Sequence, residues 1–186
     1  MVVKWDYQIK QKFISTFALL VIFSQITPPA VADIDLQADL NRIVTGIQNF
    51  DANSAATSSV TTLAEIRVIF SNNALILKQI SQANATFKRD LNVAKSQIPN
   101  RDTKASPAFS TLMNLTRGYE EWVRYQDFNQ LTAQKCLSSA KNSYDSFSNC
   151  LIVNFQKTME NERIGKMKLQ SAWNAWKKWQ VKYGYA

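Results

Sequence analysis

Few residues of this 186-residue chain have the type and spacing that catalysis or metal binding requires. Histidine is absent, which removes the commonest general base and the commonest metal ligand. Carboxylates cluster at Glu120-Glu121 and at Glu160 and Glu162, but helix neighbours one or two positions apart diverge by about 100° and 200° and do not converge on one substrate atom. The four glycines form no phosphate-binding loop and no nucleophile elbow. We therefore predict a non-enzymatic protein with no metal site and no cofactor.

The two cysteines, Cys136 and Cys150, offer a different chemistry. An even count favours a disulfide in an oxidising compartment. On one continuous helix the two Cα atoms would lie about 21 Å apart, whereas a disulfide requires roughly 4.4–6.8 Å. A bridge therefore predicts that the chain reverses near residue 143, within the polar stretch 141–146, whose Asn, Ser and Asp residues favour turns. The alternative is two buried thiols on one long helix.

Residues 1–32 have the three regions of a secretory signal peptide. Three lysines precede an apolar stretch at 13–23, and Ala30-Val31-Ala32 supplies small residues at a cleavage site. The apolar stretch is shorter than the ~20 residues that a membrane-spanning helix needs. We predict a protein that is secreted, to the periplasm or outside the cell, after cleavage between Ala32 and Asp33. An uncleaved amino-terminal anchor is the alternative.

The remaining residues, 33–186, read as a single helical domain. Apolar residues recur at helical spacing over 34–50, 60–98 and 107–140, and again from Phe147 towards Gly184. The segments between these ranges are a small polar connection at 51–59, a linker at 99–107 between the two halves of the domain, and the reversal near 143. Four helices with short connections predict an all-α, up-down bundle that contains a disulfide-clamped helical hairpin.

Several positions within these helices are expected to have particular roles. Ser106 and Pro107 resemble an N-cap and a first helical residue. The apolar positions of the last helix are expected to begin with Phe147, Leu151, Phe155 and Met159. Two Asn-x-Thr sequons, at Asn84 and Asn114, are glycosylation sites only in a host that glycosylates.

The last 24 residues differ from the rest of the domain in charge and in aromatic content. Residues 33–162 have equal numbers of basic and acidic side chains, whereas residues 163–186 have six basic side chains and no acidic one. Three of the five tryptophans also lie in this segment. Its aromatic and basic residues form the predicted interaction surface, which consists of Lys168, Trp173, Trp176, Lys177, Lys178, Trp179, Lys182 and Tyr183.

Three interpretations of this segment are compatible with its sequence. The aromatic stripe is core and the lysines are a solvated face, or the helix rests on anionic lipid with its rings at headgroup depth, or the basic patch binds a protein or another polyanion. No nucleic-acid-binding signature accompanies the patch, so nucleic acid ranks last among the polyanions.

We predict a secreted interaction protein that binds a protein or an anionic surface, with peripheral membrane contact as one form of that binding. The alternatives are a carrier of a small apolar ligand in the bundle core and a membrane-surface-active protein.

Overall fold

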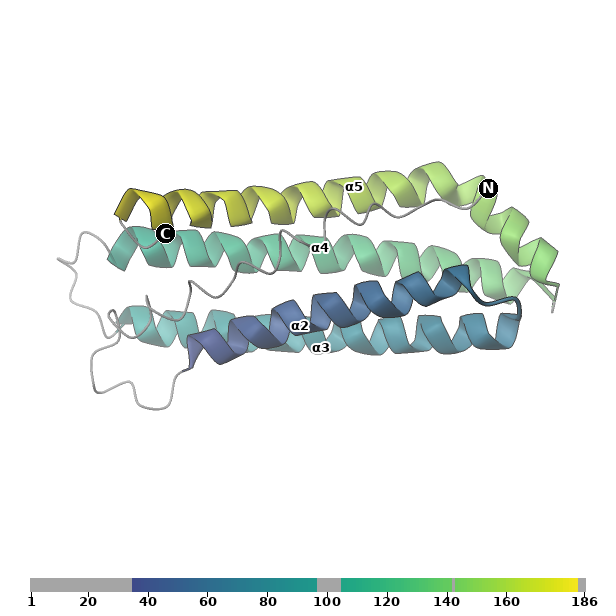
Figure 1. Ribbon diagram of the computed structural model, residues 1–186, viewed down its shortest axis with the longest axis horizontal. Coiled ribbons are helices and arrows are strands. Elements are labelled where there is room, and N and C mark those ends of the chain that lie inside the picture. Colours follow the sequence, from purple (N-terminus) through teal and green to yellow (C-terminus); the bar gives the residue numbers. More distant parts are fainter. Residues whose placement is uncertain (1–34, 97–104, 142, 184–186) are drawn as a thin grey trace.

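A computed structural model describes residues 35–96, 105–141 and 143–183. These residues form four long helices, α2 (Leu36–Ala55), α3 (Leu63–Ser96), α4 (Ala105–Ser139) and α5 (Tyr144–Tyr183), with a short 3-10 turn, η3 (Ala56–Ser58), after α2. The helices lie side by side and alternate in direction (Figure 1). The predicted all-α, up-down bundle is confirmed. The predicted signal peptide at 1–32 and most of the linker at 99–107 lie outside the described residues.

Local side-chain caps explain where two of these helices begin. The Asp35 carboxylate accepts a hydrogen bond from the Ala38 amide at 2.8 Å, before α2. Ahead of α3, the Glu65 carboxylate accepts a hydrogen bond from the Thr62 amide while the Thr62 hydroxyl accepts one from the Glu65 amide. This reciprocal capping box satisfies two amides that have no partner within the helix.

Three predicted boundaries are wrong. The second helix begins at Leu63 rather than at residue 60, because the capping box of Thr62 and Glu65 starts it there. The first helix does not end at residue 50 but continues to Ala55, because the Asn53 side chain donates hydrogen bonds to the Ile69 carbonyl and the Asn73 side chain of α3. The third helix begins at Ala105 rather than at Pro107. A proline is tolerated in a first turn because an amide there needs no partner within the helix.

The predicted core positions of α5 are only partly right. Phe147 is buried, but Phe155 and Met159 are 46% and 45% exposed. A constant spacing of four residues advances about 40° per step around a helix of 3.6 residues per turn, so a stripe beginning at Phe147 turns by about 120° before it reaches Met159. The exposure of Phe155 and Met159 follows from this drift.

The buried apolar side chains form two clusters, one toward each end of the bundle. The larger, which we call the aromatic cluster, joins all four helices and includes Ile43, Leu91, Leu115, Tyr119 and Trp176. The smaller, which we call the disulfide cluster, joins the start of α3, the end of α4 and the start of α5 around Ile66, Leu137 and Phe147. Among the residues that the structure describes, none from α2 belongs to the disulfide cluster.

Polar side chains lie along the helices between the two clusters and form what we call the polar band. The Asn73 side chain of α3 is 1% exposed and donates a hydrogen bond to the Ser54 hydroxyl of α2 at 3.0 Å. Between α4 and α5, Gln126 donates to the Glu162 carboxylate at 2.8 Å and Asn161 donates to the Asn129 side chain at 3.0 Å. Helix pairing in this band therefore depends on side-chain hydrogen bonds.

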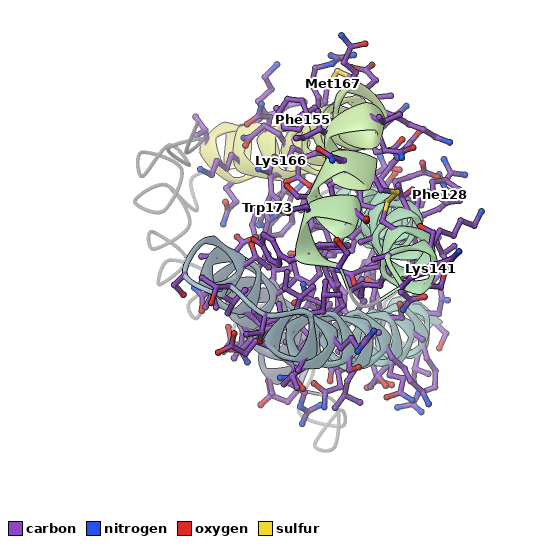
Figure 2. The ribbon with its side chains drawn as sticks, turned by 90° about the vertical axis from the view of Figure 1, so that its right-hand side faces the viewer. Phe128, Lys141, Phe155, Lys166, Met167 and Trp173 are labelled. Atoms are coloured by element: carbon purple, nitrogen blue, oxygen red, sulfur yellow. A yellow bond between two sulfur atoms is a disulfide. The ribbon has the colours of Figure 1, made fainter. Side chains whose placement is uncertain are left out.

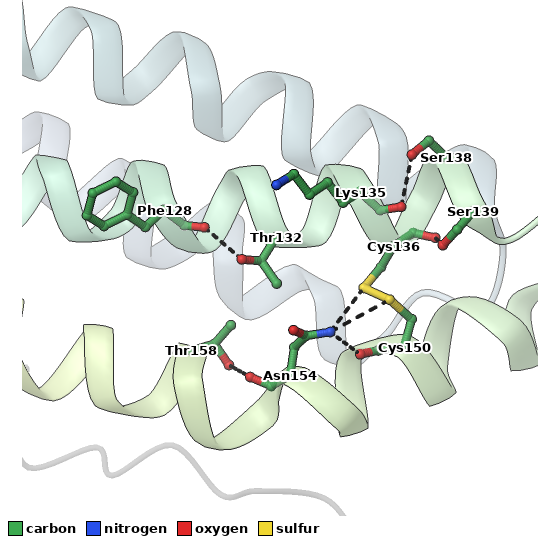
Figure 3. Close-up of a disulfide and its surroundings, with 9 residues drawn as sticks. All are labelled: Phe128, Thr132, Lys135, Cys136, Ser138, Ser139, Cys150, Asn154 and Thr158. Carbon is green, nitrogen blue, oxygen red and sulfur yellow. Dashed lines mark hydrogen bonds between the residues drawn. A yellow bond between two sulfur atoms is a disulfide. The ribbon is translucent and has the colours of Figure 1, made fainter.

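The predicted reversal and the predicted disulfide are both confirmed. Cys136 and Cys150 are bonded, with their Cα atoms 5.5 Å apart, and α4 ends at Ser139 before α5 begins at Tyr144. Lys141 adopts a left-handed backbone conformation, with φ of 45°, which reverses the chain direction. The Asn154 side chain donates a hydrogen bond to the Cys150 carbonyl and lies 3.9 Å from both sulfur atoms (Figure 3).

Candidate interaction surface on the last helix

The three tryptophans of the predicted interaction surface lie inside the bundle. Trp176 is 1% exposed, and Trp173 and Trp179 are also buried. The Trp176 and Trp179 rings stack with centroids 5.0 Å apart, and Trp173 meets the Tyr119 ring of α4 edge-on at 6.4 Å. Their spacing of three residues keeps them on the side of α5 that faces the other helices of the bundle. The interpretation of the stripe as core is therefore confirmed for these three residues.

This burial corrects part of the predicted surface. Trp173, Trp176 and Trp179 are not available to a partner, so the hypothesis that indole rings rest at lipid headgroup depth is wrong. Helical periodicity places the three rings on one face, but it does not show whether that face meets solvent or another helix. Tyr183 is the last residue of α5, and its side chain lies outside the described residues.

Close backbone approach brings the tryptophan-bearing part of α5 onto α4. A Cβ atom at Gly118 of α4 would lie 2.9 Å from the Cβ of Ala172 in α5, closer than unstrained packing permits. The glycine therefore lets the two helices approach closely enough for the indoles to fill the space around Tyr119. The buried indole N–H of Trp176 has no hydrogen-bond partner among the described residues, which costs about 1–3 kcal/mol, so apolar packing must outweigh that cost.

The lysines of the predicted surface lie on the solvent side of α5. Lys168, Lys177, Lys178 and Lys182 are all exposed. The six ion pairs found among the described residues do not involve Lys168, Lys177 or Lys178. In the view along the bundle, Met167 lies at the outer edge of α5 and Trp173 on the side that faces the other helices (Figure 2). The predicted surface thus divides into a buried aromatic half and an exposed cationic half.

Sequence reasoning missed an exposed apolar set on the same helix. Ile152, Phe155 and Met159, in the first half of α5, are all exposed. Their spacings of three and four residues are a helical signal, but the same signal describes a buried stripe equally well. The four-residue spacing from Phe147 to Met159 rotates these positions around the helix axis, and this rotation was the signal in the sequence that Phe155 and Met159 lie outside the core.

The carboxylates considered for catalysis bind separate partners. Glu120 pairs with Lys88 of α3 at 2.8 Å, and Glu121 pairs with Arg124 at 2.6 Å. On α5, the Arg163 guanidinium holds the pKa of Glu160 below its ordinary value. These carboxylates are therefore surface groups with their own cations and do not face one another across a site.

Tyr119 is the most deeply buried titratable group of the aromatic cluster. Burial raises the pKa of its hydroxyl, an effect that the neighbouring Trp173 indole partly opposes. The hydroxyl therefore stays protonated at neutral pH and supplies neither a base nor a nucleophile.

A groove between α3 and α4 is open to solvent. Its lining mixes polar, charged and apolar side chains, among them Asn84, Lys88, Glu120 and Val123. Ligand carriers use enclosed, mostly apolar cavities, so this groove lends the carrier hypothesis no support. Asn84 is buried and donates a hydrogen bond to the Thr116 carbonyl at 3.0 Å, which leaves no room for a glycan there, whereas Asn114 is exposed.

No family model, curated protein or solved structure matches this chain. Within the described ranges, no three His, Cys, Asp or Glu side chains gather where they could hold a metal ion. None of the four described helices contains an apolar stretch long enough to cross a bilayer.

Proposed function

We propose that this protein is a non-enzymatic binding protein that recognises an anionic partner through the exposed lysines of the second half of α5. The observation that carries the proposal is the exposure of Lys168, Lys177 and Lys178, in a segment without a single acidic residue from Arg163 onward. A region of one charge sign attracts the opposite sign and speeds encounter with it. Elsewhere in the domain, acidic and basic residues are balanced.

The buried tryptophans support this proposal indirectly. They fix the second half of α5 against α4, so the main chain that bears the lysines is already ordered in the unbound protein. Binding by a preformed helix avoids the entropy cost of folding a flexible basic tail. On this proposal the buried tryptophans hold the helix in place, and the exposed lysines contact the partner.

The absence of histidine, the separate pairing of the carboxylates and the protonated state of Tyr119 favour binding over catalysis. The disulfide supports export, because such bonds persist in oxidising compartments. We propose secretion after cleavage between Ala32 and Asp33, which amino-terminal sequencing of protein recovered outside the producing cell would test.

Heparin affinity at increasing salt tests the proposed contact. Replacing Lys168, Lys177 and Lys178 together by Gln should weaken binding roughly tenfold or more and lower the eluting salt concentration. The matched control replaces Lys78, Lys95 and Lys135, three exposed lysines on α3 and α4, by Gln. Both variants lose three charges, so equal weakening would mean that only net charge matters and that the proposal is wrong.

A further inference from the structure

Exposed apolar side chains are concentrated on the same helix as the lysines. Of the twelve exposed large apolar residues among those described, seven lie on α5, and Val153, at 83%, is the most exposed of them. Helix α2 has none. A helix that packs on one side only should be polar on its outer side, and a concentration of this kind marks a contact surface.

Most of the exposed apolar side chains of α5 share one face of the helix with some of its basic side chains. At 100° per residue, five of the apolar residues fall within an arc of about 120°, namely Ile152, Phe155, Met159, Met167 and Val181. Lys177 falls within the same arc, and Lys178 lies about 20° beyond its edge. Arg163 and Lys166 also fall within it, but each pairs with a carboxylate of α5, Glu160 and Glu162. Met167 and Phe155 lie on the part of α5 directed away from α3, and Lys166 lies at its flank, between Phe155 and Trp173 (Figure 2). A single outward face of the helix therefore presents apolar groups and positive charge together.

We propose that the anionic partner is a lipid surface, on which α5 rests along this outward face. This inference rests on the proposed function and specifies which kind of anionic partner the protein binds. An acidic polysaccharide or a nucleic-acid backbone would contact the lysines, but it has no apolar layer in which Ile152 or Phe155 could be buried, so these side chains would add little to its affinity. A bilayer with anionic headgroups provides both a negative surface for the lysines and an apolar layer for the side chains between them.

The contact has a definite geometry. Helix α5 has 40 residues and is therefore about 60 Å long. Its first half contributes Ile152, Phe155 and Met159, which enter the boundary between headgroups and acyl chains. Its second half contributes most of the positive charge. The indole rings take no part, because the packing of the bundle buries them.

Co-sedimentation with vesicles tests this inference. The probes are vesicles of equal parts phosphatidylglycerol and phosphatidylcholine, and vesicles of phosphatidylcholine alone. The protein should sediment with the first and not with the second. The apolar variant replaces Ile152, Phe155 and Met159 by Gln, and its partition onto the anionic vesicles should fall about tenfold or more, while its elution from heparin stays the same.

The matched control replaces three exposed apolar residues of α3, Val68, Leu75 and Val93, by Gln, and it should bind vesicles like the unmodified protein. Circular dichroism and thermal unfolding check that each variant keeps its fold. Each variant has the same amino-terminal segment, so any lipid binding by residues 1–32 is common to all of them.

The outcomes separate this inference from the proposed function. If the apolar variant binds vesicles and heparin as tightly as the unmodified protein does, the lipid inference is wrong and the anionic-partner proposal stands. If the triple lysine variant keeps both activities, both proposals are wrong. If sedimentation equilibrium without lipid gives a dimer that the apolar variant abolishes, the face binds a second copy of this chain, and the lipid inference is again wrong.

Discussion

At one end of the bundle α4 and α5 are joined by large buried rings, whereas at the other end they are joined by a covalent bond and a small apolar cluster. The aromatic cluster contains Tyr119, Trp122, Trp173, Trp176 and Trp179 and includes residues of all four helices. The disulfide cluster contains six buried residues of three helices. Where α2 is missing, less apolar surface is available to bury, and the disulfide supplies the connection that packing does not.

This difference shows how one helix pair can be stabilised in two ways along its length. The polar band lies between the two clusters, and there the first half of α5 turns amides toward α4 and apolar side chains toward solvent. In the second half of α5 the tryptophans turn toward the bundle, and the lysines face solvent together with Met167 and Val181. The two halves of α5 therefore differ mainly in what they turn toward α4, amides in one and large rings in the other.

The largest expected effect lies in the aromatic cluster. Replacing Trp176 by Ala should lower the free energy of unfolding by about 3–5 kcal/mol, because a large ring leaves a cavity in a packed core. Replacing Phe155 by Ala, at an exposed site of the same helix, should change it by no more than about 0.5–1 kcal/mol. Urea denaturation measures both, and similar losses would contradict the contrast between the two halves of α5.

Removing the disulfide is expected to have the next largest effect. Replacing Cys136 and Cys150 by Ala should destabilise the protein by about 3 kcal/mol in the chain-entropy estimate. Amide hydrogen exchange should accelerate more at residues 144–151 than at residues 169–179, because the disulfide cluster loses its main support. The unmodified protein after reduction is the control. A uniform acceleration along α5 would show that the two ends unfold as one unit.

A smaller effect is expected in the polar band. Replacing Asn73 by Ala should cost about 1–3 kcal/mol, because the Asn53 amide and the Ser54 hydroxyl lose buried hydrogen-bond partners. The neighbouring Asn72 is exposed, and its replacement by Ala should leave the melting temperature almost unchanged. If both variants melt alike, the band contributes nothing specific.

The smallest effect concerns pH and belongs to the aromatic end. Burial raises the pKa of Asp39 above its ordinary value of 3.8, and the side chain and charge of Asp90 raise it further, while Arg42 opposes the shift. The stability that neutral Asp39 contributes is present in full below pH 3.8 and is lost as the pH rises through the folded-state pKa.

Replacing Asp39 by Asn keeps that position neutral at every pH. The variant should therefore be more stable than the unmodified protein at pH 7, by about 1 kcal/mol or less, and the two should converge near pH 3. Thermal unfolding across this range measures the difference. A variant that is less stable at pH 7 would mean that the pairing of Arg42 with ionised Asp39 outweighs the cost of burial.

Much of the fold was predictable because helical periodicity and cysteine geometry are local properties. The spacing of Leu112, Leu115 and Tyr119 predicts one buried face, and the 14-residue separation of Cys136 and Cys150 predicts the reversal. The boundary at residue 50 was wrong because the contact of Asn53 with α3 extends α2 beyond its local signal. The boundary at residue 107 was wrong because a first turn tolerates a proline, so α4 begins two residues earlier.

The candidate surface was predictable only in part. The lysines of the predicted surface are exposed, as their charge favours, but the tryptophan spacing fits a core face and a lipid-facing face equally well. The choice between them depends on the close approach of Gly118 to Ala172, which brings together positions 54 residues apart. No pattern within α5 alone contains that information.

The position of the disulfide has one more consequence, for the response of the protein to proteases. Cys136 and Cys150 enclose the whole helix reversal within a covalent loop. A single cut at the tip, beside Lys141, would break the chain but would not release α5, since the two pieces stay tied by their sulfur atoms. The cleaved protein therefore keeps its last helix and the proposed binding surface on that helix. Without the disulfide, the same cleavage would separate α4 from α5.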